Sequence, residues 1–236
     1  GNGKYNPKHA AQNSTACIDC VAGRWSNTPA ATTIDKCFAC GAGTWSQSIG
    51  ADSSASCIAC GKGKYNPKHA ATDAAACIDC VAGRWSNTPA ATKIDNCLAC
   101  DAGKWSQSIG AASSTSCIAC GNGKYNPKLA AAIATACIDC KPGRFNPLPG
   151  AYNASACYPC VAGKYSSTQG ASEKEVCKSC SPNSFSEEVG ASSESVCKTC
   201  GFGLISTNNV CTFTGSALSA GIYIGVGVIV LIAIGF

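Results

Sequence analysis

Cysteine spacing constrains this chain more than any other feature. Twenty of its 21 cysteines form ten C-x-x-C pairs with a strict 20-residue period, at 17/20, 37/40, 57/60, 77/80, 97/100, 117/120, 137/140, 157/160, 177/180 and 197/200. A 20-residue segment cannot bury a core of its own, so neighbouring repeats must stack and be cross-linked. The period therefore predicts a linear array of about eleven repeats over residues 1–211, the last of them short.

Other residues follow the same period. We number the places 1 to 20 within each repeat, so that the repeats are 1–20, 21–40 and so on, and the second cysteine of each pair is at place 20. Glycine occupies the third place of nearly every repeat, and Lys or Arg precedes eight of the ten aromatics at place 5. These aromatics are Tyr5, Trp25, Trp45, Tyr65, Trp85, Trp105, Tyr125, Phe145, Tyr165 and Phe185. We interpret the rings as the main apolar contact of each repeat, covering a disulfide, in preference to platforms for sugars or bases.

The local pattern indicates short extended stretches separated by turns. Asn-Pro and Thr-Pro steps follow the aromatics, and such steps end any helix. No window before the C-terminal tail shows sustained helical periodicity. We expect a small disulfide-rich fold, mainly β or irregular, built as an elongated linear array of short hairpins.

A longer period, three repeats in length, lies over the short one. Segments 1–60 and 61–120 are identical at 48 of 60 positions, which indicates that three different repeats were duplicated as one block. The repeats of 121–211 are more diverged. We therefore divide the chain into a repeat array, 1–211, and an apolar tail, 212–236.

The spacing C-x2-C-x16-C-x2-C also fits a four-cysteine zinc site. Such sites would use repeats two at a time, whereas the duplicated block holds three, and Cys211 would have no role. Two N-x-S/T sequons, at Asn13 and Asn153, and the apolar tail point to the secretory route, where thiols are oxidised. We expect disulfides and no metal or other cofactor.

Equivalent repeats should be paired equivalently, which favours a ladder that joins the second cysteine of each pair to the first of the next. The ladder consists of Cys20–Cys37, Cys40–Cys57, Cys60–Cys77, Cys80–Cys97, Cys100–Cys117, Cys120–Cys137, Cys140–Cys157, Cys160–Cys177, Cys180–Cys197 and Cys200–Cys211. Cys17 is left over, and its partner would stand just before Gly1, so we expect the chain to be the C-terminal part of a longer array. Pairing first with first and second with second also fits the spacing.

Several functional classes find little support. The net charge of +5 is spread thinly, without the basic stripe of a nucleic-acid-binding protein. His9 and His69 occupy equivalent places, but the third copy carries Leu129, so this histidine is a poor candidate for a catalytic base. Ten evenly spaced C-x-x-C pairs on no βαβ scaffold are structural, not redox-active. We expect no enzyme activity.

The C-terminal tail is apolar, and no charged residue follows Lys198. From Ala217 it has 20 residues, just enough to span a bilayer as a helix, but no basic residue follows it. Ending on an apolar run is typical of a lipid-anchor signal, with Ser216 among small residues as the candidate attachment site. A spanning helix and an apolar assembly element, with Gly221-x-x-x-Gly225 as a packing motif, are the alternatives.

Repeats such as CVAGKYSSTQGASEKEVCKSC (160–180) resemble the ephrin-receptor-like and growth-factor-receptor-like cysteine-rich repeats, C-x-x-C-x-x-G-x-[YF]-S…G-A-x-S…C-x-x-C. With the apolar tail, the chain is also similar to the immobilisation-type surface antigens of ciliates. The resemblance covers residues 1–211, although the first two blocks carry Asn-Pro-Lys or Asn-Thr-Pro in place of Ser-rich turns. It implies an extracellular, rod-like, disulfide-linked and often lipid-anchored surface protein.

These observations favour a structural cell-surface glycoprotein, a coat element or filament subunit that associates with itself or with neighbouring coat proteins. Duplicating a block makes a spacer longer, whereas it does not improve a single binding site. The alternative is a receptor- or adhesin-type ectodomain that binds a protein or carbohydrate through one face. Differences concentrated on one exposed part of otherwise identical repeats would favour that alternative.

Overall fold

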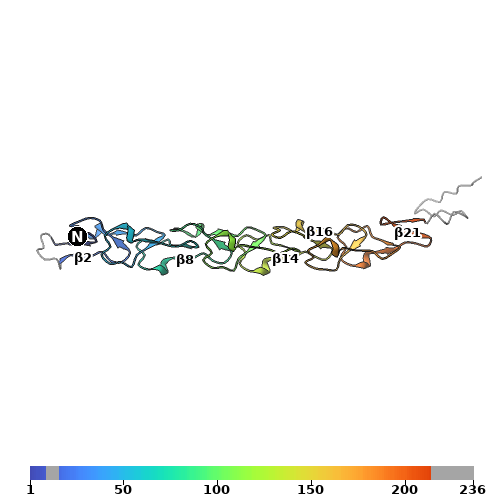
Figure 1. Ribbon diagram of the computed structural model, residues 1–236, viewed down its shortest axis with the longest axis horizontal. Helices are drawn as coiled ribbons and strands as arrows, with labels where there is room; N and C mark the ends of the chain where they lie inside the picture. Colours follow the sequence, from blue (N-terminus) through green and yellow to red (C-terminus); the bar gives the residue numbers. More distant parts are fainter. Residues whose placement is uncertain (9–15, 214–236) are drawn as a thin grey trace, which may run out of the picture. The chain divides into compact units, whose positions relative to one another are not determined.

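A computed structural model describes residues 1–8 and 16–213 of the chain (Figure 1). These residues divide into two compact units, the first Gly1–Ile138 with Leu148–Ala156 and the second Asp139–Pro147 with Cys157–Phe236, of which the description ends at Phe213. Within the first unit the hairpins follow one another in sequence order (Figure 1).

The described residues form eleven two-stranded sheets, most of them with two residues in each strand. The first ten sheets each pair the aromatic segment of one repeat with the interior of a cysteine pair, whereas the eleventh, β21 with β22, follows the last cysteine pair. The sheets are β1 (Lys4–Tyr5) with β2 (Ile18–Asp19), β3 (Arg24–Trp25) with β4 (Phe38–Ala39), β5 (Thr44–Trp45) with β6 (Ile58–Ala59), β7 (Lys64–Tyr65) with β8 (Ile78–Asp79), β9 (Arg84–Trp85) with β10 (Leu98–Ala99), β11 (Lys104–Trp105) with β12 (Ile118–Ala119), β13 (Lys124–Tyr125) with β14 (Ile138–Asp139), β15 (Arg144–Phe145) with β16 (Tyr158–Pro159), β17 (Lys164–Tyr165) with β18 (Lys178–Ser179), β19 (Ser184–Phe185) with β20 (Lys198–Thr199), and β21 (Leu204–Thr207) with β22 (Val210–Phe213).

Helix is confined, among the described residues, to single 3-10 turns that lead into the first cysteine of a pair. They are η2 (Ile34–Lys36), η3 (Ser54–Ser56), η4 (Ala74–Ala76), η5 (Ile94–Asn96), η6 (Ser114–Ser116), η7 (Ala134–Ala136), η8 (Ala154–Ala156), η9 (Lys174–Val176) and η10 (Glu194–Val196). Short turns of this kind are the usual form of 3-10 helix. The prediction of a disulfide-rich, mainly β or irregular array of 20-residue repeats is confirmed.

Each repeat bonds to the next repeat and also to the one after it. In the repeat 61–80, the Gly63 amide donates to the carbonyl of Ser86 at 2.8 Å. Tyr65 forms a parallel bridge with Ala91, and two repeats further on the Gly110 amide donates to the Cys80 carbonyl at 2.8 Å. The two kinds of hydrogen bond recur within both units and the parallel bridge recurs in most repeats, so neighbouring repeats interlock through backbone groups.

The core contains only small side chains. It consists of half-cystines, an alanine at place 11 and a polar residue at place 6, always Ser or Asn, that is at most 2% exposed. The place-6 residues are Ser26, Ser46, Asn66, Ser86, Ser106, Asn126, Asn146, Ser166 and Ser186. The Asn-Pro step at Asn66 predicted a turn but not burial of the side chain; its Nδ2 donates to the Thr44 carbonyl at 3.0 Å and its Oδ1 accepts from the Lys68 amide at 2.9 Å. These two hydrogen bonds compensate for the free-energy cost of removing the side-chain amide from water.

Candidate functional site

Ten disulfides cross-link the described residues. They join Cys20–Cys37, Cys40–Cys57, Cys60–Cys77, Cys80–Cys97, Cys100–Cys117, Cys120–Cys137, Cys140–Cys157, Cys160–Cys177, Cys180–Cys197 and Cys200–Cys211. The structure thus brings together every pair that the ladder requires. Cys17 is a free, half-buried thiol.

The zinc template has no counterpart in the structure. Its four cysteines, 57, 60, 77 and 80, belong to three different disulfides. In residues 1–8 and 16–213 no group of three or more His, Cys, Asp or Glu side chains could hold a metal ion.

Each hairpin presents a cross-strand pair of large side chains that is partly open to solvent. The aromatic at place 5 lies opposite the second residue of the next cysteine pair, as in Trp25 opposite Phe38. Their ring centroids are 5.3 Å apart at 47° between the planes, and those of Phe145 and Tyr158 are 6.0 Å apart. These opposite residues are 42–52% exposed in the first eight hairpins. These residues were not predicted to form part of a site, although a large apolar or aromatic residue follows the first cysteine in eight successive pairs.

The basic residues at place 4 differ in their contacts, and two kinds recur from block to block. Lys4 Nζ lies 2.6 Å from Asp19 Oδ1, and Lys64 Nζ lies 2.7 Å from Asp79 Oδ1 across the hairpin. Where the residue is Arg, its Nη1 donates to the carbonyl of a cysteine, as Arg84 does to Cys97 at 2.9 Å. Pairs this exposed, about 40% for each side chain, contribute little stability on their own.

The second compact unit contains one polar cluster on its surface. Tyr165 Oη donates to Glu194 Oε2 at 3.2 Å, and Ser181 Oγ donates to Glu194 Oε1. Partial desolvation of the ring, the charge of Glu194 and the hydrogen bond to it raise the pKa of Tyr165. The tyrosine therefore stays protonated and donates to the carboxylate at neutral pH.

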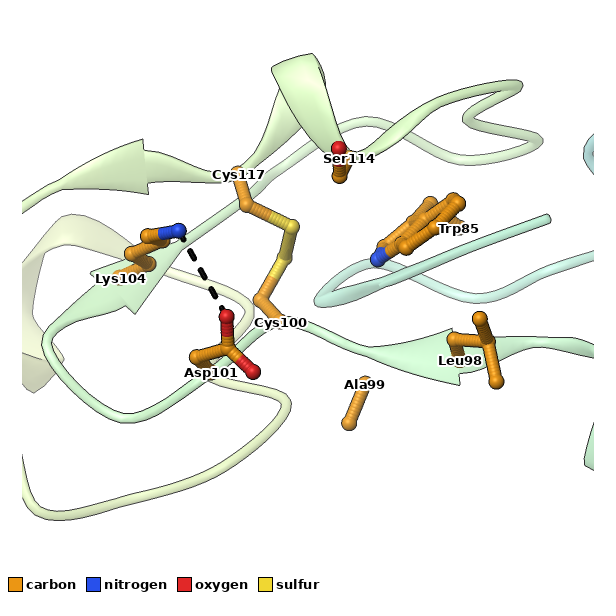
Figure 2. Close-up of a pocket in the computed structure, with 8 residues that line it drawn as sticks. All are labelled: Trp85, Leu98, Ala99, Cys100, Asp101, Lys104, Ser114 and Cys117. Atoms are coloured by element: carbon orange, nitrogen blue, oxygen red, sulfur yellow. Dashed lines mark ion pairs between the residues drawn. A yellow bond between two sulfur atoms is a disulfide. The ribbon is translucent and has the colours of Figure 1, made fainter. Parts of the chain in front are cut away.

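A hollow of about 310 Å³ opens beside Trp85; we call it the Trp85 hollow. Trp85 and Leu98 line it from β9 and β10, and Ser114 lines it from η6 (Figure 2). Asp101 and Lys104 form an ion pair, with Lys104 Nζ 3.6 Å from Asp101 Oδ2. The Cys100–Cys117 disulfide lies between this pair and Trp85 (Figure 2). An indole, a disulfide and a charged pair thus surround one open hollow.

The two blocks differ at 12 of 60 positions, and in the second block none of these positions is buried. Three of them line the Trp85 hollow, because Leu98, Asp101 and Lys104 stand where the first block has Phe38, Gly41 and Thr44. The charged pair of the hollow is therefore specific to the second block.

No protein-family model matches this chain, and no curated protein matches it.

The predicted attachment sites lie in different parts of the chain. Asn153 is half-buried at the start of η8, and its Oδ1 accepts from the amide of Ser155 at 3.1 Å and from its hydroxyl at 2.5 Å. Both bonds engage Oδ1, whereas an N-linked glycan is attached to Nδ2. Asn13, Ser216 and most of the tail 212–236 lie outside the described residues. Among the residues that are described, no helix is long and apolar enough to cross a membrane.

Proposed function

We propose that this protein is a structural component of an extracellular or cell-surface coat, in which the repeat array sets length. The observation that carries the proposal is the interlocking of the repeats. Nine disulfides have the same sequence separation, and most repeats form the same backbone hydrogen bonds with the next two repeats although their exposed residues differ.

The disulfide density supports the compartment. Ten disulfides in a chain of 236 residues are typical of proteins that fold in an oxidising environment. The resemblance to ephrin-receptor-like repeats and ciliate surface antigens supports a place at the cell surface. Within this proposal the tail, with Ser216 as the attachment site, anchors the protein, Asn13 and Asn153 carry glycans, and the array associates with copies of itself or with other coat proteins.

Electron microscopy of the full chain tests the spacer role. We expect extended particles, and deletion of the second block, 61–120, should shorten them by a constant amount. Duplicating that block should lengthen them equally. Compact particles whose longest dimension does not change with the number of blocks would refute the proposal.

The receptor or adhesin alternative is favoured by one observation. Three of the 12 differences between the blocks line one hollow, the Trp85 hollow. That hollow is a ligand-sized feature whose lining differs between the two blocks.

A further inference from the structure

We propose that the Trp85 hollow binds one hexopyranose ring of a glycan. This activity goes beyond the spacer role and does not depend on it, because the array could set length with or without a ligand in the hollow.

The size of the hollow limits the ligand. At about 310 Å³ it lies at the lower end of small-molecule pockets, roughly 300–1,000 Å³. That volume suits a single six-membered ring. The hollow is open on one side, so the ring can belong to a longer glycan that continues into solvent.

The lining supplies the two surfaces that a sugar ring requires. A pyranose has an apolar face of C–H groups and a rim of hydroxyls, and flat apolar groups stack on aromatic rings. The half-buried indole of Trp85 and the Cys100–Cys117 disulfide provide the apolar surface (Figure 2). A planar indole loses little conformational entropy on binding, which favours it over a flexible side chain.

The polar groups around this apolar surface include both hydrogen-bond donors and hydrogen-bond acceptors. Asp101 accepts hydrogen bonds from hydroxyls, Lys104 donates them, and Ser114 can do either. Because Asp101 and Lys104 already form an ion pair, the hollow has no net charge to neutralise. This combination matches a neutral, hydroxyl-rich ligand better than a phosphate or a carboxylate.

The first block provides a natural comparison. Trp25 occupies the place of Trp85, but the ring of Phe38 packs against it and the charged pair is replaced by Gly41 and Thr44. The fold around both tryptophans is the same, with the cross-strand pairs Trp25–Phe38 and Trp85–Leu98 in the same register. The second block therefore combines an indole, a smaller neighbour and polar groups that the first block lacks.

Saturation-transfer NMR with the full chain and a panel of methyl hexopyranosides tests the proposal. We expect transfer to the ring protons of at least one hexoside, with a Kd on the order of 1 mM, as for a ligand of this size. Trp85→Ala should weaken binding at least tenfold. The double variant D101G/K104T should also weaken it several-fold, and it installs residues that the first block carries at the same places.

The matched control is Trp25→Ala, which removes the equivalent indole and should leave binding unchanged. Enzymatic deglycosylation of the chain distinguishes the sources of the sugar. If the chain's own glycans fill the hollow, added hexoside should bind more strongly after deglycosylation, and if foreign glycans are the ligand, its affinity should not change. Either result supports the proposal. Absence of transfer for every hexoside before and after deglycosylation, or equal losses in Trp85→Ala and Trp25→Ala, would overturn it.

Discussion

The glycine at place 3 has a steric role in most repeats, where a Cβ would overlap a carbonyl two repeats away. Gly63 has φ of +78°, and a Cβ there would lie 2.0 Å from the carbonyl oxygen of Gly110, two repeats away. Backbone meets backbone at this point, so no side chain can rotate away to relieve the overlap. Glycine is required for both the left-handed conformation and the close approach.

We therefore expect Gly63→Ala to destabilise the array locally by about 3 kcal/mol, from left-handed strain and overpacking together. Thermal unfolding of the oxidised protein and amide hydrogen exchange at Cys80 measure the effect. Gly61→Ala is the control, because a Cβ there meets nothing within 4 Å. Equal stability of the two variants would contradict the steric argument.

A second glycine contact distinguishes repeats within a block. A Cβ at Gly110 would lie 2.5 Å from Asp79 Oδ1, whereas one at Gly150 would meet only the Ala119 Cβ at 3.6 Å. Ala70 and Ala90 occupy the equivalent left-handed place, with φ of +52° and +53°, so alanine itself is tolerated there. The side chain opposite decides whether glycine is needed.

Gly110→Ala should consequently cost about 1 kcal/mol more than Gly150→Ala, because the added Cβ overlaps the Asp79 carboxylate and forces it to move. Both glycines have positive φ, so the backbone strain cancels in the comparison. In a double-mutant cycle, Asp79→Ala should remove the extra cost. A coupling free energy near zero would show that the carboxylate moves aside without penalty.

At the scale of the element, the hairpins are too short to be stable alone. Most have two residues per strand, and an isolated two-stranded hairpin is marginal in water even when longer. The disulfides, the 3-10 turns and, in most repeats, a parallel bridge to the next repeat hold the hairpins in place. We infer that a hairpin and its disulfide form and open together.

Replacing Cys100 and Cys117 by alanine should remove about 3 kcal/mol, as expected for a loop of this length. Because repeats interlock two ahead, exchange protection should fall in the repeats on both sides of the lost disulfide. Removing Cys200–Cys211 is the comparison, since it closes the hairpin β21–β22, whose four-residue strands follow the last C-x-x-C pair. Its loss should affect only the neighbouring repeats, and equally wide effects of both losses would argue against interlocking.

The sequence allowed prediction of the hairpins and of the array because the period marks cysteine, glycine and aromatic positions directly. The contact two repeats ahead could not be predicted, since in a 20-residue period every neighbour carries the same pattern. Burial of Asn66 was missed because Asn-Pro is a turn signal, and only the tertiary contact to Thr44 shows that the side chain points inward. The Trp85 hollow depends on Leu98 and Asp101, whose positions in sequence do not indicate that they lie around one indole.

At the scale of the whole molecule, a contact between an aspartate and a glycine recurs with the same period as the three-repeat block. Asp19 and Asp79 face Gly50 and Gly110, each glycine lying two repeats ahead of its aspartate, and both series recur once per block. The other repeats of the block place alanines at these contacts. A block of three repeats can therefore be added or removed without setting an aspartate against an alanine.

Deletions test this rule. Removing 61–120 should leave thermal stability per repeat unchanged, whereas removing 81–100 should lower it, because Asp79 would then face Ala130 in place of Gly110. Removing 61–80 is the matched control, since it also deletes one repeat but takes Asp79 with it. Thermal unfolding of the three oxidised variants provides the comparison. If both single-repeat deletions are equally stable, the rule is wrong.

The disulfides also decide how the protein responds to tension. All but Cys200–Cys211 bypass a loop whose ends are 17 residues apart in sequence. A pulling force therefore passes from Cys60 through sulfur to Cys77 and reaches Cys80 three residues later. At most about 16 Å of chain per repeat can then be drawn out, against about 70 Å for 20 unbridged residues. In single-molecule stretching, the oxidised protein should lengthen very little under force, and large extension should occur only after the disulfides are reduced. The disulfides, and not the free energy of unfolding, would limit how far the protein can be extended.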